Sequence, residues 1–267
     1  MEGCALSGPD HAKYAKHAKQ PHIQCATGSV APFVLLPGDP GRTQRVAEML
    51  DTCHEVAYNR EFRTITGIYR GMPVSATSTG IGGASTAIAV EELLRIGARI
   101  LVRIGSCGAM QPGMRVGGLV LAVAAVREDG ASRMYVPDGY PAVADPELVR
   151  ALAEAAGDLR VPAYTGLVRS HDSFYTDRES ELMDFWARKG ILASDMETAA
   201  LFTVARLRGG RAASILNVVV PAGGDLEGGI DSLATGQDAA SQGEKAEIQV
   251  ALEGLFRIWQ KQNQQEV

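Results

Sequence analysis

Arg99-Ile-Leu-Val-Arg-Ile-Gly-Ser-Cys-Gly-Ala-Met-Gln-Pro-Gly113 is an apolar run that passes directly into glycines. This pattern is typical of a buried strand that opens onto a loop, and in open α/β sheets ligands bind at such strand ends. Arg103 is the exception within it, because a guanidinium is costly to bury unless it meets an anion. Gly105, Ser106 and Gly108 offer a hydroxyl and bare backbone to a small oxyanion. An internal pair between Arg103 and an Asp or Glu explains the pattern equally well.

Composition limits the class of protein. The chain has 267 residues, of which 46% are hydrophobic, enough for one large α/β domain. A net charge of -5 and a pI near 5.6 argue against a general nucleic-acid or anionic-membrane binder. The four cysteines lack zinc-site spacing, and no apolar run approaches the roughly 18 residues of a membrane span. We therefore expect a cytoplasmic protein without a metal.

The N-terminal region differs in composition from the rest of the chain. Residues 1–30 are polar and interrupted by Gly and Pro, so we expect an arm there and a single domain over 31–267. Such an arm lies on the surface or on a neighbouring subunit. It contains His22, which on sequence grounds alone is interpreted as a solvated histidine.

A second candidate anion site follows the first expected strand. Residues 33–36 are apolar, Pro37-Gly-Asp-Pro-Gly-Arg42 is a turn, and a helix is expected over 43–50. A glycine turn between a strand and a helix presents backbone amides and the helix dipole to an anion. Arg42 adds a full charge, although a generic turn with an exposed Arg42 is a fair alternative.

Strand-like and helical segments alternate along the rest of the chain, which predicts an α/β fold: a mixed, mainly parallel central sheet flanked by helices. The expected strands are 55–78, broken by turns at Gly67 and Gly71, 118–126, 163–168, 191–193 and 214–220. The expected helices are 84–96, 145–156, one with a capping box of Thr176 and Glu179 that ends at Gly190, 198–208 and an amphipathic C-terminal helix. We expect 126–132 to be a polar loop and 223–243 to be mobile.

The conspicuous polar residues lie at the expected strand ends and suit two kinds of ligand. Arginines beside glycine turns suit phosphate, whereas a carboxylate such as Glu197 can accept both hydrogens of a sugar diol. Pairing of Arg103 only with Glu197 is an alternative. The chain has no P-loop and no HExxH, 79–83 does not continue into a dinucleotide fingerprint, and 104–108 misses GxSxG by one position.

Several motifs occur in order along the chain. They are Pro37-Gly-Asp-Pro-Gly-Arg42, Asn59-Arg-Glu-Phe62, Ser78-Thr-Gly-Ile-Gly-Gly83, Arg103-Ile-Gly-Ser-Cys-Gly108, Asp129-Gly-Ala-Ser132, Pro141-Ala-Val-Ala-Asp145 and Asp195-Met-Glu-Thr198. Together they resemble the nucleoside phosphorylase-I family, and most of all bacterial uridine phosphorylases. The resemblance implies phosphorolysis of a nucleoside to free base and (deoxy)ribose 1-phosphate, with uridine favoured. It implies inorganic phosphate as co-substrate, no cofactor, and a homo-oligomer, a hexamer built of dimers.

The resemblance also implies a role for individual residues at three subsites. Phosphate would be bound by Gly38, Arg42, Arg103 and Ser106, with Arg60 from an adjacent subunit; ribose by Glu197, Met196 and the neighbour's His22; and the base by Phe174. The placement of His22 requires a gap of two residues between it and the Gly38 turn.

The base-reading residues depart from the family pattern. Uridine phosphorylases carry a Gln-x-Arg pair after the Phe-Tyr step, and here Arg178 and Ser180 occupy its two positions. Relatives that act on purines place an Asp where this chain has Val220. Loss of hydrogen-bonding groups weakens discrimination between bases, so the base preference is altered or relaxed. Arg178 or His171 could replace the lost contacts, and an exposed, non-functional Arg178 is the alternative.

Other functions fit the same fold. They are a purine nucleoside phosphorylase, a nucleoside hydrolase or nucleosidase, and a non-catalytic nucleoside-binding protein. The hydrolase is disfavoured because a water nucleophile needs no phosphate site such as the one that Arg42, Arg103 and Ser106 would form.

Overall fold

The apolar run that contains Arg103 forms β5, which pairs with three other strands of the sheet. The computed structural model describes residues 19–224 and 239–265. Its strands are β1 (Phe33–Pro37), β2 (Thr52–Asn59), β3 (Phe62–Tyr69), β4 (Met72–Thr77), β5 (Ile100–Ala109), β6 (Leu119–Glu128), β7 (Ala142–Val143), β8 (Ala163–His171), β9 (Ala193–Asp195) and β10 (Arg211–Val220). Its helices are α1 (Pro40–Ala47), α2 (Gly83–Arg95), α3 (Gly130–Tyr135), α4 (Pro146–Asp158), α5 (Glu179–Ala187), α6 (Thr198–Leu207) and α8 (Ala239–Gln265).

The sheet is mixed, and part of it closes on itself. β5 pairs in parallel with β1 and β10 and antiparallel with β9. β10 also pairs with β6, which continues through β8 to β9, so five strands form a ring. β4, β3 and β2 extend the sheet beyond β1. The α/β prediction is therefore confirmed.

The pairing of β5 creates an opening in the sheet. On one side β5 follows β1 only as far as Ile104 and meets β9 only from Gly108, whereas on its other side β10 accompanies it throughout. Residues 105–107 thus lack a neighbouring strand on one side. Such a switch of partners is where open α/β sheets bind ligands.

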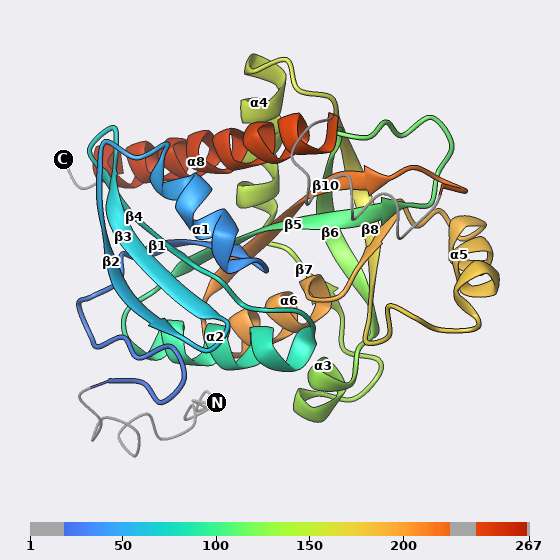
Figure 1. Ribbon diagram of the computed structural model, residues 1–267, viewed down its shortest axis with the longest axis horizontal. Coiled ribbons are helices and arrows are strands. Elements are labelled where there is room, and N and C mark those ends of the chain that lie inside the picture. Colours follow the sequence, from blue (N-terminus) through green and yellow to red (C-terminus); the bar gives the residue numbers. More distant parts are fainter. Residues whose placement is uncertain (1–18, 225–238, 266–267) are drawn as a thin grey trace, which may run out of the picture.

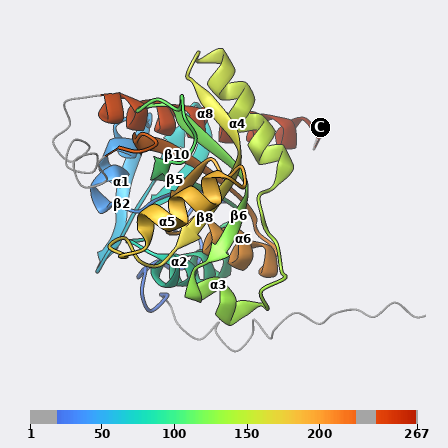
Figure 2. The same cartoon turned by 90° about the vertical axis from the view of Figure 1, so that its right-hand side faces the viewer.

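Helices cover both faces of the sheet (Figure 1). One apolar core lies under α2 and α6, and a second lies under α1, α4 and α8. α5 lies apart from both helical layers, in front of the strands in the view of Figure 2. None of α5's residues is fully buried, so this helix is free to present its first turn to a neighbouring cavity.

Two expectations about turns and caps are wrong. Gly67 lies inside β3, where a Cβ would come within 2.2 Å of the Thr52 carbonyl oxygen, so this glycine permits close pairing with β2. The Thr176 capping box does not form, because the residue before α5 is Arg178 and it makes no side-chain cap. The expected 126–132 loop is also interrupted, because Asp129 caps α3, which begins inside it at Gly130.

The described end of the N-terminal arm packs into the chain's own core. Ile23 and Cys25 are fully buried, and the His22 backbone N–H donates to a Glu92 oxygen at 3.0 Å. Residues 19–30 therefore do not lie wholly on the surface, because the side chains of Ile23 and Cys25 cover one edge of the core. The boundary between arm and domain stays a prediction. Of the expected mobile segment, 239–243 begin α8 and 225–238 lie outside the described residues.

Candidate active site

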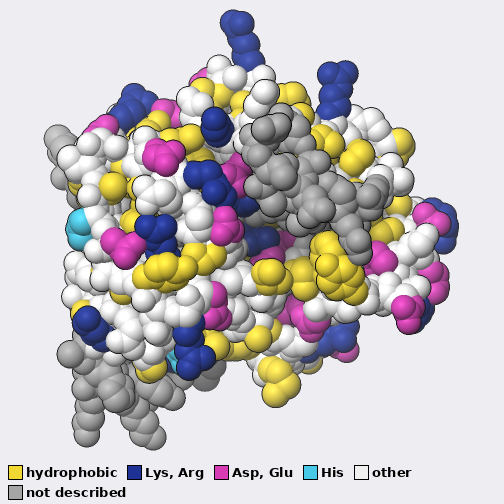
Figure 3. All heavy atoms as spheres, viewed as in Figure 1, with side chains coloured by type: hydrophobic (Ala, Val, Ile, Leu, Met, Phe, Trp, Pro, Cys, Tyr) yellow, Lys and Arg dark blue, Asp and Glu magenta, His cyan; other side chains and the backbone are white. Residues whose placement is uncertain are grey.

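One cavity of about 1160 Å³ opens beside residues 105–107. Its walls come from the β1–α1 and β2–β3 turns, the β4–α2 loop, the ends of β5, β8 and β10, the β9–α6 junction, and the first turns of α5 and α8. In Figure 3, basic and acidic side chains lie close together around the hollow on this face. The segments that form it are distant in the sequence, so the fold rather than any single motif assembles this site.

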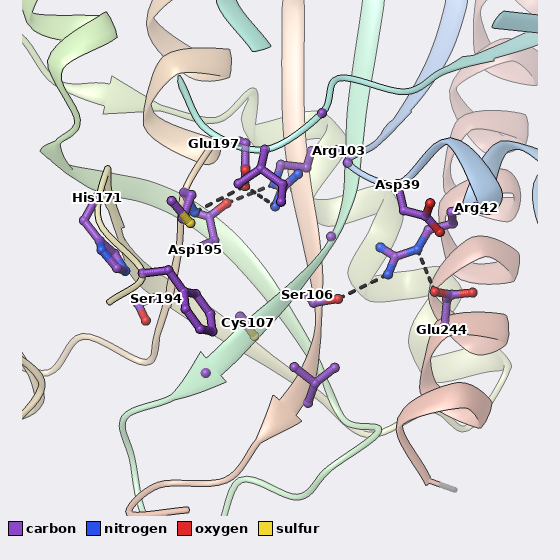
Figure 4. A pocket seen from close by; sticks show the side chains of 18 of the residues that line it. Asp39, Arg42, Arg103, Ser106, Cys107, His171, Ser194, Asp195, Glu197 and Glu244 are labelled. Atoms are coloured by element: carbon purple, nitrogen blue, oxygen red, sulfur yellow. Dashed lines mark hydrogen bonds and ion pairs between the residues drawn. The ribbon is translucent and has the colours of Figure 1, made fainter. Parts of the chain in front are cut away.

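Arg42 lies at one end of the cavity (Figure 4). The turn before α1 places it there, with Asp39 as the N-cap of the helix. Its Nε donates to Glu244 at 2.7 Å, its Nη1 to the Ile104 carbonyl at 3.0 Å, and its Nη2 to Ser106 Oγ at 3.2 Å. Arg42 is only 4% exposed. A buried cation and a hydroxyl are thus held together, as a bound oxyanion requires.

A second carboxyl, Glu247, lies behind Arg42. It is fully buried, accepts the Gly105 N–H at 2.7 Å and lies 3.4 Å from Arg42 Nη1. Burial raises the pKa of Glu247 to about 8, an effect that the charge of Arg42 opposes and that of Glu244 reinforces. Below that pH the Glu247 carboxyl is neutral and does not offset the positive charge of Arg42.

Arg103 and Glu197 lie in the middle of the cavity. Arg103 bonds Asp195 at 2.9 Å and Glu197 at 2.5 Å, and a Cβ at Gly105 would come within 2.5 Å of its guanidinium. Glycine at this position therefore lets Arg103 fold back over its own strand. The internal Arg–acid pairing left open from the sequence is present, and Arg103 lines the cavity as well.

Glu197 is held by backbone as well as by charge. The Gly82 N–H donates to its Oε1 at 2.6 Å, which joins the β4–α2 loop to the start of α6. Burial raises the pKa of Glu197, although Arg103 acts in the opposite direction. The carboxylate is thereby fixed in the cavity wall, where it can accept hydroxyl hydrogens.

His171 lies at the end of the cavity away from Arg42 (Figure 4). Phe174 and Glu179 also line the cavity, and the charge of Glu179 acts on His171. The His171 Nδ1 lies 3.0 Å from the Ser173 carbonyl oxygen, which can only accept, so Nδ1 carries the proton. Burial, and then the nearby charge of Arg169, lower the pKa of His171. A neutral ring with a protonated Nδ1 offers Nε2 as an acceptor.

The structure brings most, but not all, of the predicted site residues together. Gly38, Arg42, Arg103, Ser106, His171, Phe174, Met196 and Glu197 line the cavity. Arg178 does not line the cavity. Its side chain is 65% exposed and pairs with Glu181 at 2.9 Å, which agrees with the alternative of an exposed Arg178. His22 and Arg60 also lie outside this cavity; His22 Nδ1 contacts Glu92 at 2.6 Å, and Arg60 is exposed in the β2–β3 turn.

Four acids of the site were missed in the sequence. Glu61, Glu179 and Glu244 line the cavity, and Glu247 supports it. Glu244 and Glu247 are three residues apart on the helix face that also buries Ile248, and acids within a buried stripe were the available signal. Among the described residues, no group of His, Cys, Asp and Glu could hold a metal ion. None of the described helices has the length and apolarity that crossing a membrane requires.

A cavity with a buried arginine and hydroxyl at one end and a fixed carboxylate beside them has the chemistry to bind an oxyanion and a polyhydroxyl ligand together. Residues 32–252 match the family described as the phosphorylase superfamily, and the chain belongs to that family. It is 46% identical over 211 residues to a uridine phosphorylase of Thermococcus kodakarensis, covering 74% of this chain and 76% of the relative.

Other relatives carry different names. A guanosine phosphorylase of Halorubrum lacusprofundi is 39% identical over 235 residues, which cover 88% of this chain and 95% of the relative. The crystal structure of a uridine phosphorylase from Vibrio fischeri ES114 superposes with a TM-score of 0.85 at 43% identity, covering 91% of this chain and 99% of that one. The predicted family is confirmed.

Proposed function

We propose that this protein is a nucleoside phosphorylase that releases the free base and (deoxy)ribose 1-phosphate, with uridine favoured as substrate. The observation that carries the proposal is one cavity that contains both the Arg42–Ser106 pair and the fixed Glu197 carboxylate. The relatives named uridine phosphorylase support it. Inorganic phosphate is the co-substrate, and we propose no other cofactor.

The geometry suits phosphorolysis because phosphate itself is the nucleophile. A phosphate oxygen forms a bond to C1′ of the sugar while the bond from C1′ to the base nitrogen breaks, and the electron pair of that bond leaves with the base. The enzyme must align the two reactants, which can contribute about 7–11 kcal/mol when the geometry is ideal. Arg42 and Arg103 stabilise the phosphate, and Glu197 accepts the ribose hydroxyls, with Met196 against the sugar and Phe174 against the base.

Guanosine is a second candidate substrate. The guanosine phosphorylase of Halorubrum lacusprofundi matches a larger share of this chain than the Thermococcus relative does. A hydrolase has less support, because water as the nucleophile would leave Arg42 and Ser106 without a phosphate to bind. A non-catalytic nucleoside-binding protein has less support for the same reason, since it would not need the Arg42–Ser106 pair.

We propose that the site is shared between subunits. Arg60 and His22 do not line their own chain's cavity, and Ile81, which does, is 80% exposed. A neighbour placed against that wall would cover Ile81 and bring Arg60 to the phosphate and His22 to the sugar. The minimal active unit is then a dimer, three dimers form a hexamer, and the protein acts in the cytoplasm on small molecules rather than on nucleic acid or membranes.

The test is a panel of nucleosides incubated with and without phosphate, followed by chromatography of the products. Phosphate-dependent release of uracil from uridine is the expected result. Release that does not depend on phosphate would identify a hydrolase, and binding without any release would identify a non-catalytic protein.

A further inference from the structure

The base end of the cavity contains an acid that the family comparison does not assign. Arg178 and Ser180 occupy the positions of the base-reading pair, and neither lines the cavity. Glu179, which lies between them in the first turn of α5, does line it, and its side chain is 22% exposed. Helix geometry explains why Glu179 faces the cavity and its two neighbours do not. Successive residues point in directions about 100° apart, so only one of the three can face the cavity.

Glu179 is short of hydrogen-bond donors. Its Oε2 is buried and has no partner, and its Oε1 lies 3.6 Å from Arg169 Nη1, beyond hydrogen-bond distance. Arg169 is only 2% exposed, and its Nε is already bonded to Glu128 at 2.5 Å. A cation thus stands behind the Glu179 carboxylate without saturating it, and a buried acceptor without a donor is costly unless a ligand supplies one.

We propose that Glu179 is the base-reading residue of this protein, that Arg169 positions it, and that it selects bases with a ring N–H beside a carbonyl. The proposal rests on the proposed function, since it concerns the base end of the same cavity. A carboxylate can only accept hydrogen bonds. Uracil presents its N3–H to such a group, and hypoxanthine and guanine present N1–H.

The same chemistry excludes two other bases. Cytosine and adenine have a lone pair on the corresponding ring nitrogen, so a carboxylate oxygen there would face another acceptor. His171 cannot compensate, because its Nδ1–H is directed to the Ser173 carbonyl and its Nε2 only accepts. The structure therefore favours uridine over cytidine, and inosine and guanosine over adenosine.

Guanine fits the carboxylate in one further respect. Its 2-amino group lies beside N1–H, so the two Glu179 oxygens can accept two parallel N–H hydrogen bonds, which hypoxanthine cannot offer. Such bidentate, charge-assisted contacts are stronger than single neutral ones. Guanosine should therefore be a better substrate than inosine, and uridine and guanosine should share one site.

The experiment measures kcat/KM for uridine, cytidine, guanosine, inosine and adenosine with the parent protein and with Glu179→Gln. An amide carries one donor and one acceptor, so it can match the ring nitrogen and amino group of cytosine or adenine. The uridine-to-cytidine and guanosine-to-adenosine ratios should each fall by about 10-fold or more in the variant. KM for phosphate should not change, because Arg42 bonds Glu244, Ile104 and Ser106, whereas Glu179 faces Arg169.

Glu181→Gln is the matched control. Glu181 is in the same helix turn, but it is 67% exposed and pairs with Arg178, so both ratios should stay at the parent's values. An active parent whose ratios are the same in Glu179→Gln would overturn the base assignment and leave the proposed function standing. A parent that releases no base from any of the five nucleosides would overturn both. Equal shifts in Glu181→Gln would show an effect of helix charge and refute the contact.

Discussion

Replacement of Glu247 by Gln tests the electrostatics behind the phosphate end of the cavity. The carboxyl is enclosed by α8, the Gly105 N–H, Arg42 and Glu244, and Arg103 acts on it from β5. Burial raises its pKa from 4.5 to about 8. Glutamine has nearly the same shape and can still accept the Gly105 N–H, but it has no proton to gain or lose.

The sign and size of the effect follow from proton linkage. Between pH 4.5 and about 8, this carboxyl is ionised in the unfolded chain but protonated in the folded one, so folding takes up a proton. The stability that this group contributes is therefore fully present below pH 4.5 and is lost as the pH rises toward 8. Each pH unit is worth about 1.4 kcal/mol, so the whole range amounts to about 5 kcal/mol.

The assay is urea unfolding of the parent and Glu247→Gln at several pH values between about 5 and 8, at one protein concentration. As the pH rises, the unfolding free energy of the variant minus that of the parent should increase by about 1.4 kcal/mol per pH unit. Glu154→Gln is the control, because Glu154 is largely exposed on α4 and its curve should stay parallel to that of the parent. Parallel curves for Glu247→Gln and the parent would refute the raised pKa.

Three further predictions concern the reaction. Arg42→Gln should raise KM for phosphate by about 10-fold or more and change KM for the nucleoside much less, because it deletes a charge-assisted contact to one ligand; equal changes in both would contradict the phosphate assignment. Glu197→Gln should reduce kcat/KM more for ribonucleosides than for 2′-deoxyribonucleosides, which lack one of its two hydroxyl donors, and equal losses would show that it does not contact the 2′-hydroxyl. Mixing inactive Arg60→Ala and Glu197→Ala proteins should restore activity, since some interfaces then contain one intact site; exchange shown by mass spectrometry without activity would mean that each site is built from one chain.

Local sequence patterns predicted the elements of the fold but not their closure into a ring. The apolar run of β5 and the cap, Pro and acid at Asp145-Pro-Glu147 are short-range signals, and both elements formed. β5 runs further than expected, because Gly105, Ser106 and Gly108 belong to the strand and not to a loop after it. Pairing of β10 with both β5 and β6 is a long-range property that no window of sequence contains. α3 was missed because it depends on the Asp129 cap and has no apolar periodicity of its own.

The site was predicted where strand ends carry unusual residues, and missed where helices contribute. Arg103 lies inside an apolar strand, Glu197 closely follows one, and Arg42 lies in the first turn of the helix after one, so each was a candidate for the site. Glu244 bonds Arg42 across 202 residues of sequence, and sequence gives no measure of such a contact. Glu179 was not predicted because the family motif places the base-reading pair at positions 178 and 180. Which of these neighbouring side chains faces the cavity depends on the orientation of α5, which the sequence does not give. The roles of the individual residues stay predictions.

The charge of the cavity bears on how phosphate is bound. Among the described residues, three arginines and six carboxylates line it, so its formal charge is -3 when His171 is neutral. All three arginines, Arg42, Arg45 and Arg103, already pair with acids. A phosphate dianion would therefore enter a negative environment, which Coulomb's law makes unfavourable at short range in a poorly solvated site. Either carboxyls take up protons as phosphate binds, or a further cation enters the site. Arg60, exposed on its own chain, would be such a cation if a neighbour supplied it, and the mixing experiment distinguishes that arrangement from one in which each chain balances its own charge.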